Sequence, residues 1–191
     1  MTRVHAAAAA LLVCITLSPP IMARELSLPE KLDAIAAEAF AKDGPGGSVI
    51  VVQDGKTLLR KGYGMADLEL GVPVKPEMVF RIGSMGKQFT AVAILQLVKE
   101  GKVKFDDPLS KYVPDFPGAE AITVEQLLTH TSGIRSYNDV PSAQIGARED
   151  KTPMQLVDGI RNEKPAFAPG ESWMYSNSGY LFLGIIIEKA S

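Results

Sequence analysis

The pattern of hydrophobic and polar residues divides the first half of the chain into a helix, a β-hairpin and a second helix. Residues 26–42, LSLPEKLDAIAAEAFAK, have helical spacing, with Ser27 as the expected N-cap. Residues 48–64, SVIVVQDGKTLLRKGYG, are two runs rich in β-forming residues. Asp54-Gly55 joins these runs and predicts a hairpin turn.

A second, strongly apolar helix is predicted for residues 84–100, with Gly101 at its end. It follows residues 71–83, which contain two prolines and are expected to be extended. Lys87 falls in the first turn of this helix, where the partial positive charge of the helix N-terminus disfavours a cation. Almost everything after Lys87 in this helix is expected to be buried, so the position of the lysine needs an explanation.

The second half of the chain is predicted to contain three further helices. One begins near Thr123 and is closed by Gly133, one begins at Pro153, and a last apolar helix runs from Tyr180 to the end of the sequence. The segments around them are polar or rich in proline and glycine, and they are predicted to be loops: 104–121, 134–152 and 164–179.

The N-terminus has the pattern of a secretory signal peptide. Residues 1–5 carry one arginine, twelve residues from Ala6 to Leu17 are apolar except for Thr16, and SPPIMA ends in the small residue Ala23. The apolar run is too short to span a bilayer as a helix. We therefore expect a signal peptide at residues 1–23, cleavage near Ala23, and a periplasmic or secreted protein. A buried N-terminal helix is the competing interpretation.

Composition restricts the classes of partner. The 191 residues suffice for one domain, and 46% hydrophobic with 22% charged residues is typical of a globular protein. The formal net charge of −2 offers no basic surface for nucleic acid or anionic lipid. We expect no nucleic-acid partner and no stable membrane insertion.

Removal of residues 1–23 would also remove the only cysteine, Cys14, and one of the two histidines, His5. The mature chain would then have no disulfide, no cysteine nucleophile and no cysteine-based metal site. A Ser-His-Asp triad would depend wholly on His130.

Ser84 and Lys87 are three residues apart, so their side chains share one face of the predicted helix. A serine hydroxyl becomes a good nucleophile when a neighbouring group takes its proton. An uncharged lysine can do so, and burial together with the positive end of the helix dipole favours the uncharged form. On its own, S-x-x-K more often marks a helix cap and a solvent-exposed lysine, so a second motif is needed.

The stretch WMYSNSGY, residues 173–180, supplies that second motif. A phenol near an ammonium group ionises more readily, so Tyr175 can serve as acid or base. The Asn177 amide can donate to a substrate carbonyl and accept from Lys87. The alternative is that Ser176 or Asn177 caps the last helix while Tyr175 packs.

Three stretches together resemble the serine β-lactamase and penicillin-binding protein superfamily: FRIGSMGKQFTAVAILQLVKEGKVKFDDPLSKYVPDFP, ITVEQLLTHTSGI and APGESWMYSNSGYLFLGIIIEKAS. The resemblance covers roughly residues 28–191 and is to the class C β-lactamase-like branch, with D-alanyl-D-alanine carboxypeptidases and esterases. It implies an α+β fold, an antiparallel sheet flanked by helices plus a mostly helical region, and a serine hydrolase domain at residues 24–191.

The resemblance also implies roles for four residues. Ser84 would be the acylated nucleophile, Lys87 its proton acceptor, Tyr175 the acid/base, and Asn177 a substrate-binding residue that also positions Lys87. No metal or organic cofactor is implied. His130, in the HTSG stretch, is interpreted as a structural residue whose charge is favourable at a helix C-terminus.

The implied reaction is acyl transfer on a small-molecule or peptidoglycan-like substrate, either a β-lactam or a D-Ala peptide amide. An esterase on the same scaffold and a non-catalytic fragment are the alternatives. The third element of the superfamily, Lys or His followed by Thr or Ser and Gly, does not follow Asn177. The domain is therefore expected to be the N-terminal portion of a longer one, incomplete at its C-terminus.

Overall fold

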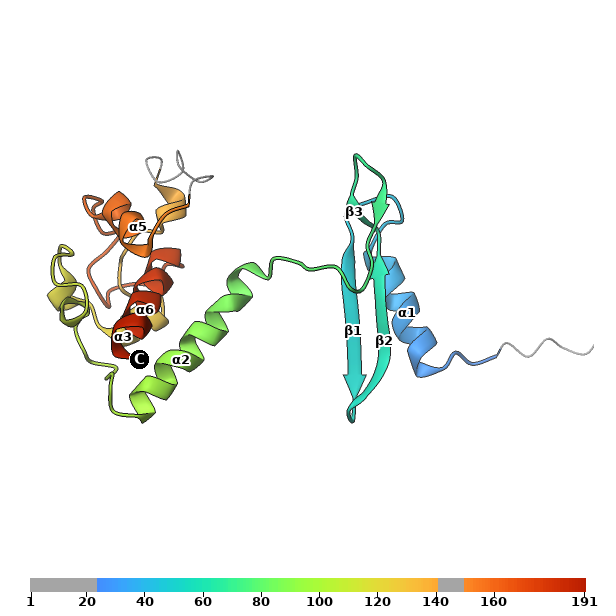
Figure 1. The fold of residues 1–191 in the computed structure, drawn as a ribbon, viewed down its shortest axis with the longest axis horizontal. Helices are drawn as coiled ribbons and strands as arrows, with labels where there is room; N and C mark the ends of the chain where they lie inside the picture. Colours follow the sequence, from blue (N-terminus) through green and yellow to red (C-terminus); the bar gives the residue numbers. More distant parts are fainter. Residues whose placement is uncertain (1–23, 141–149) are drawn as a thin grey trace, which may run out of the picture. The chain divides into compact units, whose positions relative to one another are not determined.

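The computed structural model describes residues 24–140 and 150–191. The predicted signal peptide, residues 1–23, lies outside this part of the chain, as does much of the predicted loop 134–152. The chain divides into two compact units, with the boundary between Phe80 and Arg81. Each unit is described by itself, with the element labels of Figure 1.

The first unit begins with helix α1, Leu28–Ala39. Ser27 starts it, as the sequence predicted: its backbone N–H and its hydroxyl both donate to the Glu30 carboxylate, at 2.8 and 2.7 Å. The helix ends three residues before the predicted end. Phe40 leaves the helix in an extended conformation, and its ring stacks on Tyr63 with 5.8 Å between the ring centroids.

The predicted hairpin is confirmed, and it is the partner of α1. Strands β1, Gly47–Gln53, and β2, Lys56–Tyr63, pair antiparallel. Asp54 and Gly55 both have positive φ, 49° and 73°, which suits a two-residue hairpin turn. Helix α1 packs along β2 (Figure 1), where the Tyr63 hydroxyl donates to Asp33 at 2.7 Å.

A second small sheet was not predicted. It pairs β3, Met65–Asp67, with β4, Val72–Pro73, in antiparallel fashion. Strands of three and two residues are too short to show a period in the sequence. The residues that follow β4 are extended or turn-like up to residue 82, as predicted.

The second unit is helical. It contains α2, Lys87–Lys99, α3, Val124–Leu128, α5, Pro153–Ile160, and α6, Asn177–Ala190. Short 3₁₀ turns occur at η1 to η4: Gly83–Gly86, Leu109–Lys111, Ala119–Ala121 and Tyr137–Asp139. The four predicted helices are therefore confirmed, with changes at their ends.

Helix α6 is the centre of the core of the second unit. It contacts α2, α3 and α5, as Figure 1 shows for α2 and α3, and Phe182, Leu183 and Ile186 on it are fully buried. The Phe116 ring meets the Phe182 ring edge-on with 4.8 Å between centroids. Fully burying one such side chain is worth about 1.5–3 kcal/mol, so α6 holds the unit together.

Helix α2 departs from the expectation of nearly complete burial. Only Ile94 and Leu97 on it are buried, whereas Phe89, Val92 and Leu95 are 65, 53 and 50% exposed. The reason is geometric, because α6 covers one side of α2, and among the described residues of the second unit no other helix covers the opposite side to a similar extent.

The helix α3 ends at Leu128, and not at Gly133 as predicted. The backbone after it is occupied by another segment: the N–H groups of Ala166, Gly170 and Met174 donate to the carbonyls of Gly133, Thr131 and His130, at 2.9, 2.8 and 3.0 Å. These bonds hold residues 130–133 against residues 166–174. His130 itself has a φ of 62°, which ends the helix.

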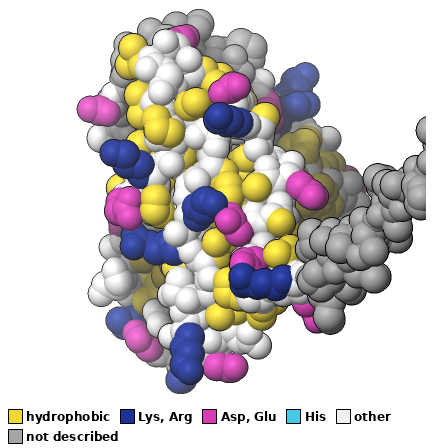
Figure 2. Space-filling model, turned by 90° about the vertical axis from the view of Figure 1, so that its right-hand side faces the viewer, with side chains coloured by type: hydrophobic (Ala, Val, Ile, Leu, Met, Phe, Trp, Pro, Cys, Tyr) yellow, Lys and Arg dark blue, Asp and Glu magenta, His cyan; other side chains and the backbone are white. Residues whose placement is uncertain are grey.

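The surface shows no concentration of one charge on the face drawn in Figure 2. Basic and acidic side chains are interspersed there among hydrophobic ones.

Of the helices in the described ranges, none combines the length and the apolar character that a membrane span requires.

Candidate active site

Ser84 and Lys87 lie at the junction of η1 and α2. Gly83 has a φ of 53°, a conformation that favours glycine, and it turns the extended chain into η1. Ser84 follows in this turn, and the Lys87 N–H donates to the Ser84 carbonyl as α2 begins. The predicted shared face is confirmed, since Lys87 Nζ lies 3.3 Å from Ser84 Oγ and donates to it.

Tyr175 and Asn177 lie on either side of Ser176 at the start of α6. Ser176 is buried, and its hydroxyl accepts from the Gly179 N–H at 3.2 Å, so Ser176 is the N-cap. The helix starts at Asn177, three residues before the predicted start. The cap alternative therefore holds for Ser176, and it fixes the backbone from which both neighbours project.

The structure brings all four predicted site residues together within the second unit. The Tyr175 hydroxyl and Ser84 Oγ are 2.5 Å apart, and either atom can be the donor. Lys87 Nζ donates to Asn177 Oδ1 at 2.6 Å and lies 4.7 Å from the centroid of the Tyr175 ring. The lysine thus contacts the hydroxyl, the phenol ring and the amide at once.

The electrostatics of this cluster favour ionisation of the phenol. The hydrogen bond from Lys87 is the largest cause that lowers the pKa of Tyr175 below its ordinary value of 10, and the bond with Ser84 adds to it. Partial burial opposes both effects. A phenolate at this position is within reach of the Ser84 proton, so the pair can convert the hydroxyl into a nucleophile.

Two residues that the sequence did not single out hold Asn177 in place. The Asn177 Nδ2 group donates to Asn138 Oδ1 at 2.7 Å, and the Asn177 N–H donates to Ser136 Oγ at 3.1 Å. Because the amide NH₂ faces Asn138, the amide oxygen faces Lys87. These contacts join residues about 40 positions apart, and no local pattern in the polar segment 134–152 indicates them.

His130 makes a structural contact that the sequence did not indicate. It contacts the segment of the site residues: Nδ1 accepts from the Ser176 N–H at 3.1 Å. Burial lowers the pKa of His130, and the charge of Lys87 lowers it further. Both surroundings favour the uncharged imidazole and so oppose the positive charge that was expected at the end of α3.

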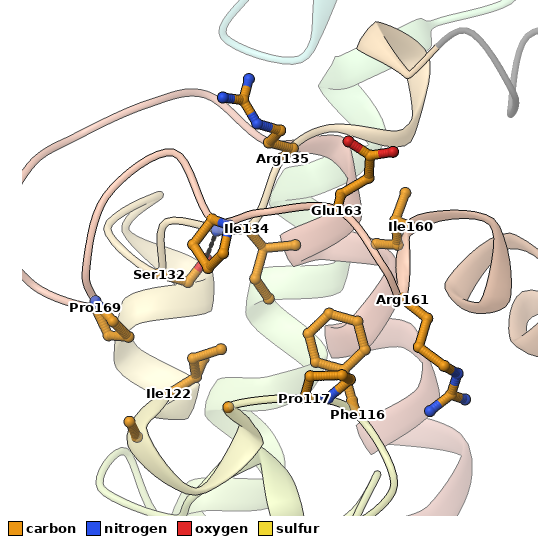
Figure 3. A pocket seen from close by; sticks show the side chains of 13 residues that line it. Phe116, Pro117, Ile122, Ser132, Ile134, Arg135, Ile160, Arg161, Glu163 and Pro169 are labelled. Atoms are coloured by element: carbon orange, nitrogen blue, oxygen red, sulfur yellow. Dashed lines mark hydrogen bonds between the residues drawn. The ribbon is translucent and has the colours of Figure 1, made fainter.

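Ser132, the other serine of the HTSG stretch, does not join the cluster. It is 3% exposed, and its hydroxyl accepts from the Ile134 N–H at 3.3 Å in its own turn. Ser132 also lines a cavity of about 270 Å³, drawn in Figure 3.

This cavity is separate from the four site residues, none of which lines it. Figure 3 shows Phe116, Ile122 and Ile134 around it, with the charged groups of Arg135, Arg161 and Glu163 extending away. The Arg161 guanidinium is held by the Asp158 carboxylate and by the Asp115 carbonyl. The cavity is thus a mainly apolar space whose polar groups do not converge on one point. This favours the cluster of Ser84, Lys87, Tyr175 and Asn177, called the Ser84 cluster below, as the reactive site.

The described ranges also lack a donor set for a metal ion. No group of three or more His, Cys, Asp or Glu side chains comes together in residues 24–140 and 150–191.

Comparison with known proteins gives one matching family over most of the chain. A family model described as Beta-lactamase matches residues 32–191. This range contains the whole Ser84 cluster together with His130, Ser136 and Asn138.

Three similar proteins agree with this match. Protein flp of Staphylococcus aureus (strain MW2) is 35% identical over 168 residues, which are 85% of this chain and 33% of that protein. Penicillin-binding protein 4* of Bacillus subtilis (strain 168) is 35% identical over 147 residues, 76% of this chain and 32% of that one. The crystal structure of a D-stereospecific amidohydrolase from Streptomyces sp. has 34% identity and a TM-score of 0.69, covering 82% of this chain and 48% of that one. The chain therefore spans about a third of the curated relatives and about half of the solved structure.

Proposed function

Because the chain belongs to the β-lactamase family, we propose that it is a serine hydrolase in which Ser84 forms an acyl-enzyme. The fold is of the β-lactamase/transpeptidase-like α+β type, and the family is one of hydrolases. The observation that carries the proposal is the 2.5 Å separation of Ser84 Oγ and the Tyr175 hydroxyl, with Lys87 beside both.

The reaction begins with attack of Ser84 Oγ on a carbonyl carbon. As the new C–O bond forms, the Ser84 proton passes to the Tyr175 phenolate, which lies closest to it. The tetrahedral intermediate then collapses, the C–N bond breaks, and the Tyr175 proton goes to the leaving nitrogen. A water molecule then attacks the acyl carbonyl and gives a proton to the Tyr175 phenolate. Tyr175 returns this proton to Ser84 Oγ as the acyl–oxygen bond breaks, which frees the acid and restores Ser84.

Lys87 and Asn177 have supporting roles in this scheme. When Tyr175 is ionised, Lys87 stabilises the phenolate by its charge and holds the Ser84 hydroxyl. In the alternative protonation state, with Tyr175 neutral and Lys87 uncharged, Lys87 takes the Ser84 proton instead. Asn177 holds Lys87 through Oδ1, while one N–H of its amide is bonded to Asn138. The second N–H of this amide can donate to a substrate carbonyl.

The proposed substrate is a β-lactam or a D-Ala peptide amide. Its support comes from two relatives, one named a penicillin-binding protein and the other described as a D-stereospecific amidohydrolase. Both names describe those proteins. For this chain they favour an amide carbonyl in a small-molecule or peptidoglycan-like substrate.

A substrate panel tests the function with the complete gene product. We expect Ser84-dependent turnover of a chromogenic cephalosporin or of a D-alanyl-D-alanine peptide, and slower turnover of a p-nitrophenyl ester. The Ser84→Ala protein is the blank for each substrate. Turnover of the ester alone would replace the proposed amide substrate by an ester, and the absence of Ser84-dependent turnover in every arm would refute the hydrolase.

We further propose that the protein is exported, on the basis of the signal-like residues 1–23. The expected result is a mature protein that begins near Arg24, so the intact mass of exported protein lacks about 23 residues. Mass spectrometry of periplasmic or culture-supernatant fractions measures this directly. Recovery of the uncleaved chain from the cytoplasm alone would contradict export.

A further inference from the structure

His130 holds the backbone on both sides of Tyr175. Its carbonyl accepts from the Met174 N–H at 3.0 Å, and its Nδ1 accepts from the Ser176 N–H at 3.1 Å. Its ring is tilted by 33° against the Tyr175 ring, with 4.7 Å between the centroids. One residue thus fixes the residue before Tyr175, the residue after it, and the phenol ring itself.

The conformation of His130 makes this arrangement possible. A φ of 62° is uncommon for a residue other than glycine and marks a position held by its surroundings. Tyr180 supports it from α6, since its ring lies 5.1 Å from the imidazole and its hydroxyl donates to the Leu128 carbonyl at 3.1 Å. The imidazole therefore lies in a pocket of aromatic rings, with Trp173 at 6.1 Å on a further side.

We propose that His130 is a positioning residue for the Ser84 reaction, in which its uncharged Nδ1 accepts the Ser176 N–H and so holds the Tyr175 hydroxyl against Ser84. The inference rests on the proposed function, because it assigns a supporting group to the same site. It goes beyond a structural role, because loss of the Nδ1 acceptor is expected to change the position of the phenol relative to Ser84.

Protonation of His130 opposes this arrangement. An imidazolium has a proton on Nδ1, which cannot accept from the Ser176 N–H. Within the described chain, the titratable groups that face the ring are Lys87 from α2, Tyr175 from the segment just before α6, and Tyr180 from α6 itself. Burial and Lys87 lower the pKa of His130 below its ordinary 6.5, so the acceptor is present at neutral pH and is lost on acidification.

Two variants distinguish the effect of losing the Nδ1 acceptor from the effect of the positive φ at residue 130. Both asparagine and glycine tolerate a positive φ. In His130→Asn, the amide oxygen stands near the place of Nδ1 and can accept the Ser176 N–H, whereas His130→Gly has no acceptor. With the complete gene product, we expect His130→Gly to label Ser84 about 10–100-fold more slowly with a fluorescent penicillin or a fluorophosphonate, as misplacement of a reacting group does. His130→Asn is expected to recover most of this loss.

The pH dependence of the Ser84 labelling rate distinguishes a positioning role of His130 from a purely structural one. In the wild type, the logarithm of the labelling rate should fall with a slope of about one as Tyr175 becomes protonated, and with a slope approaching two over about one to two pH units below the pKa of His130. In His130→Asn the slope should stay at about one throughout. Equal rates and equal slopes in the wild type and His130→Gly would overturn the proposal, as would an Asn variant as slow as the Gly variant.

The imidazole can also be observed without any reaction. Nitrogen-15 NMR of the histidine-labelled gene product, with the His130 signal assigned by its loss in His130→Asn, should show Nε2 protonated and Nδ1 unprotonated at pH 7. A proton on Nδ1 would refute the inference even if Ser84 is active. Wild-type protein that shows this tautomer but no Ser84 labelling would refute the proposed function and leave the imidazole contact established.

Discussion

Replacement of Ser84 by alanine is expected to abolish covalent labelling of the complete gene product by a fluorescent penicillin or a fluorophosphonate. The reason is that no acyl-enzyme can form without the Ser84 hydroxyl, and loss of a serine nucleophile costs about 10⁶-fold in turnover in a well-studied serine protease. Peptide mapping of the labelled wild type should place the adduct on the peptide that contains Ser84. Turnover of the substrate panel should fall to the uncatalysed rate in the same variant.

Ser132 provides the matched control for this experiment. It is a serine of the same unit, but it is buried and its hydroxyl is bonded within its own turn. Labelling should therefore survive in Ser132→Ala. Labelling that persists in Ser84→Ala and vanishes in Ser132→Ala would show that the wrong serine was assigned.

Replacement of Lys87 by alanine is expected to slow the acylation of Ser84 by about 10²–10⁴-fold, the usual contribution of a positioned acid–base group. It should also move the rising limb of the pH–rate profile to higher pH. Lys87 is the largest cause of the lowered pKa of Tyr175, so the phenol of the variant ionises nearer its ordinary value of 10. Stopped-flow acylation measured between pH 5 and pH 10 tests both effects on one set of samples.

Lys99 is the control on the same helix. It lies in the last turn of α2, so Lys99→Ala also removes one charge but leaves the contacts of Lys87 intact. Its acylation rate and pH profile should match those of the wild type. A Lys87→Ala protein with an unshifted profile would mean that Lys87 does not govern the ionisation of Tyr175.

Most helices and the hairpin could be predicted because their signals are local. The caps at Ser27 and Thr123, and the proline at the first position of α5, are short-range features that a few neighbouring residues specify. The Asp54-Gly55 turn is likewise encoded by two residues. The S-x-x-K spacing placed Ser84 and Lys87 on one face for the same reason.

What the sequence did not reveal depends on contacts between distant segments. Helix α3 ends where His130 takes a positive φ, and backbone bonds to residues 166–174 hold the segment that follows, so Gly133 was a misleading stop signal. The support of Asn177 by Ser136 and Asn138 spans about 40 residues and has no period or motif. The exposure of Phe89 on α2 also escaped prediction, because an apolar composition does not say which partner covers a helix.

All four residues of the proposed reaction, and His130 with them, belong to residues 81–191. Their hydrogen bonds to one another therefore need no atom of α1 or of the hairpin. These hydrogen bonds can therefore be compared among homologues from residues 81–191 alone. Homologues that differ in residues 24–80 are expected to keep the Ser84–Tyr175, Lys87–Ser84 and Lys87–Asn177 hydrogen bonds wherever residues 81–191 are similar. Chimaeric genes that exchange this segment between homologues would show how far the two halves can be inherited separately.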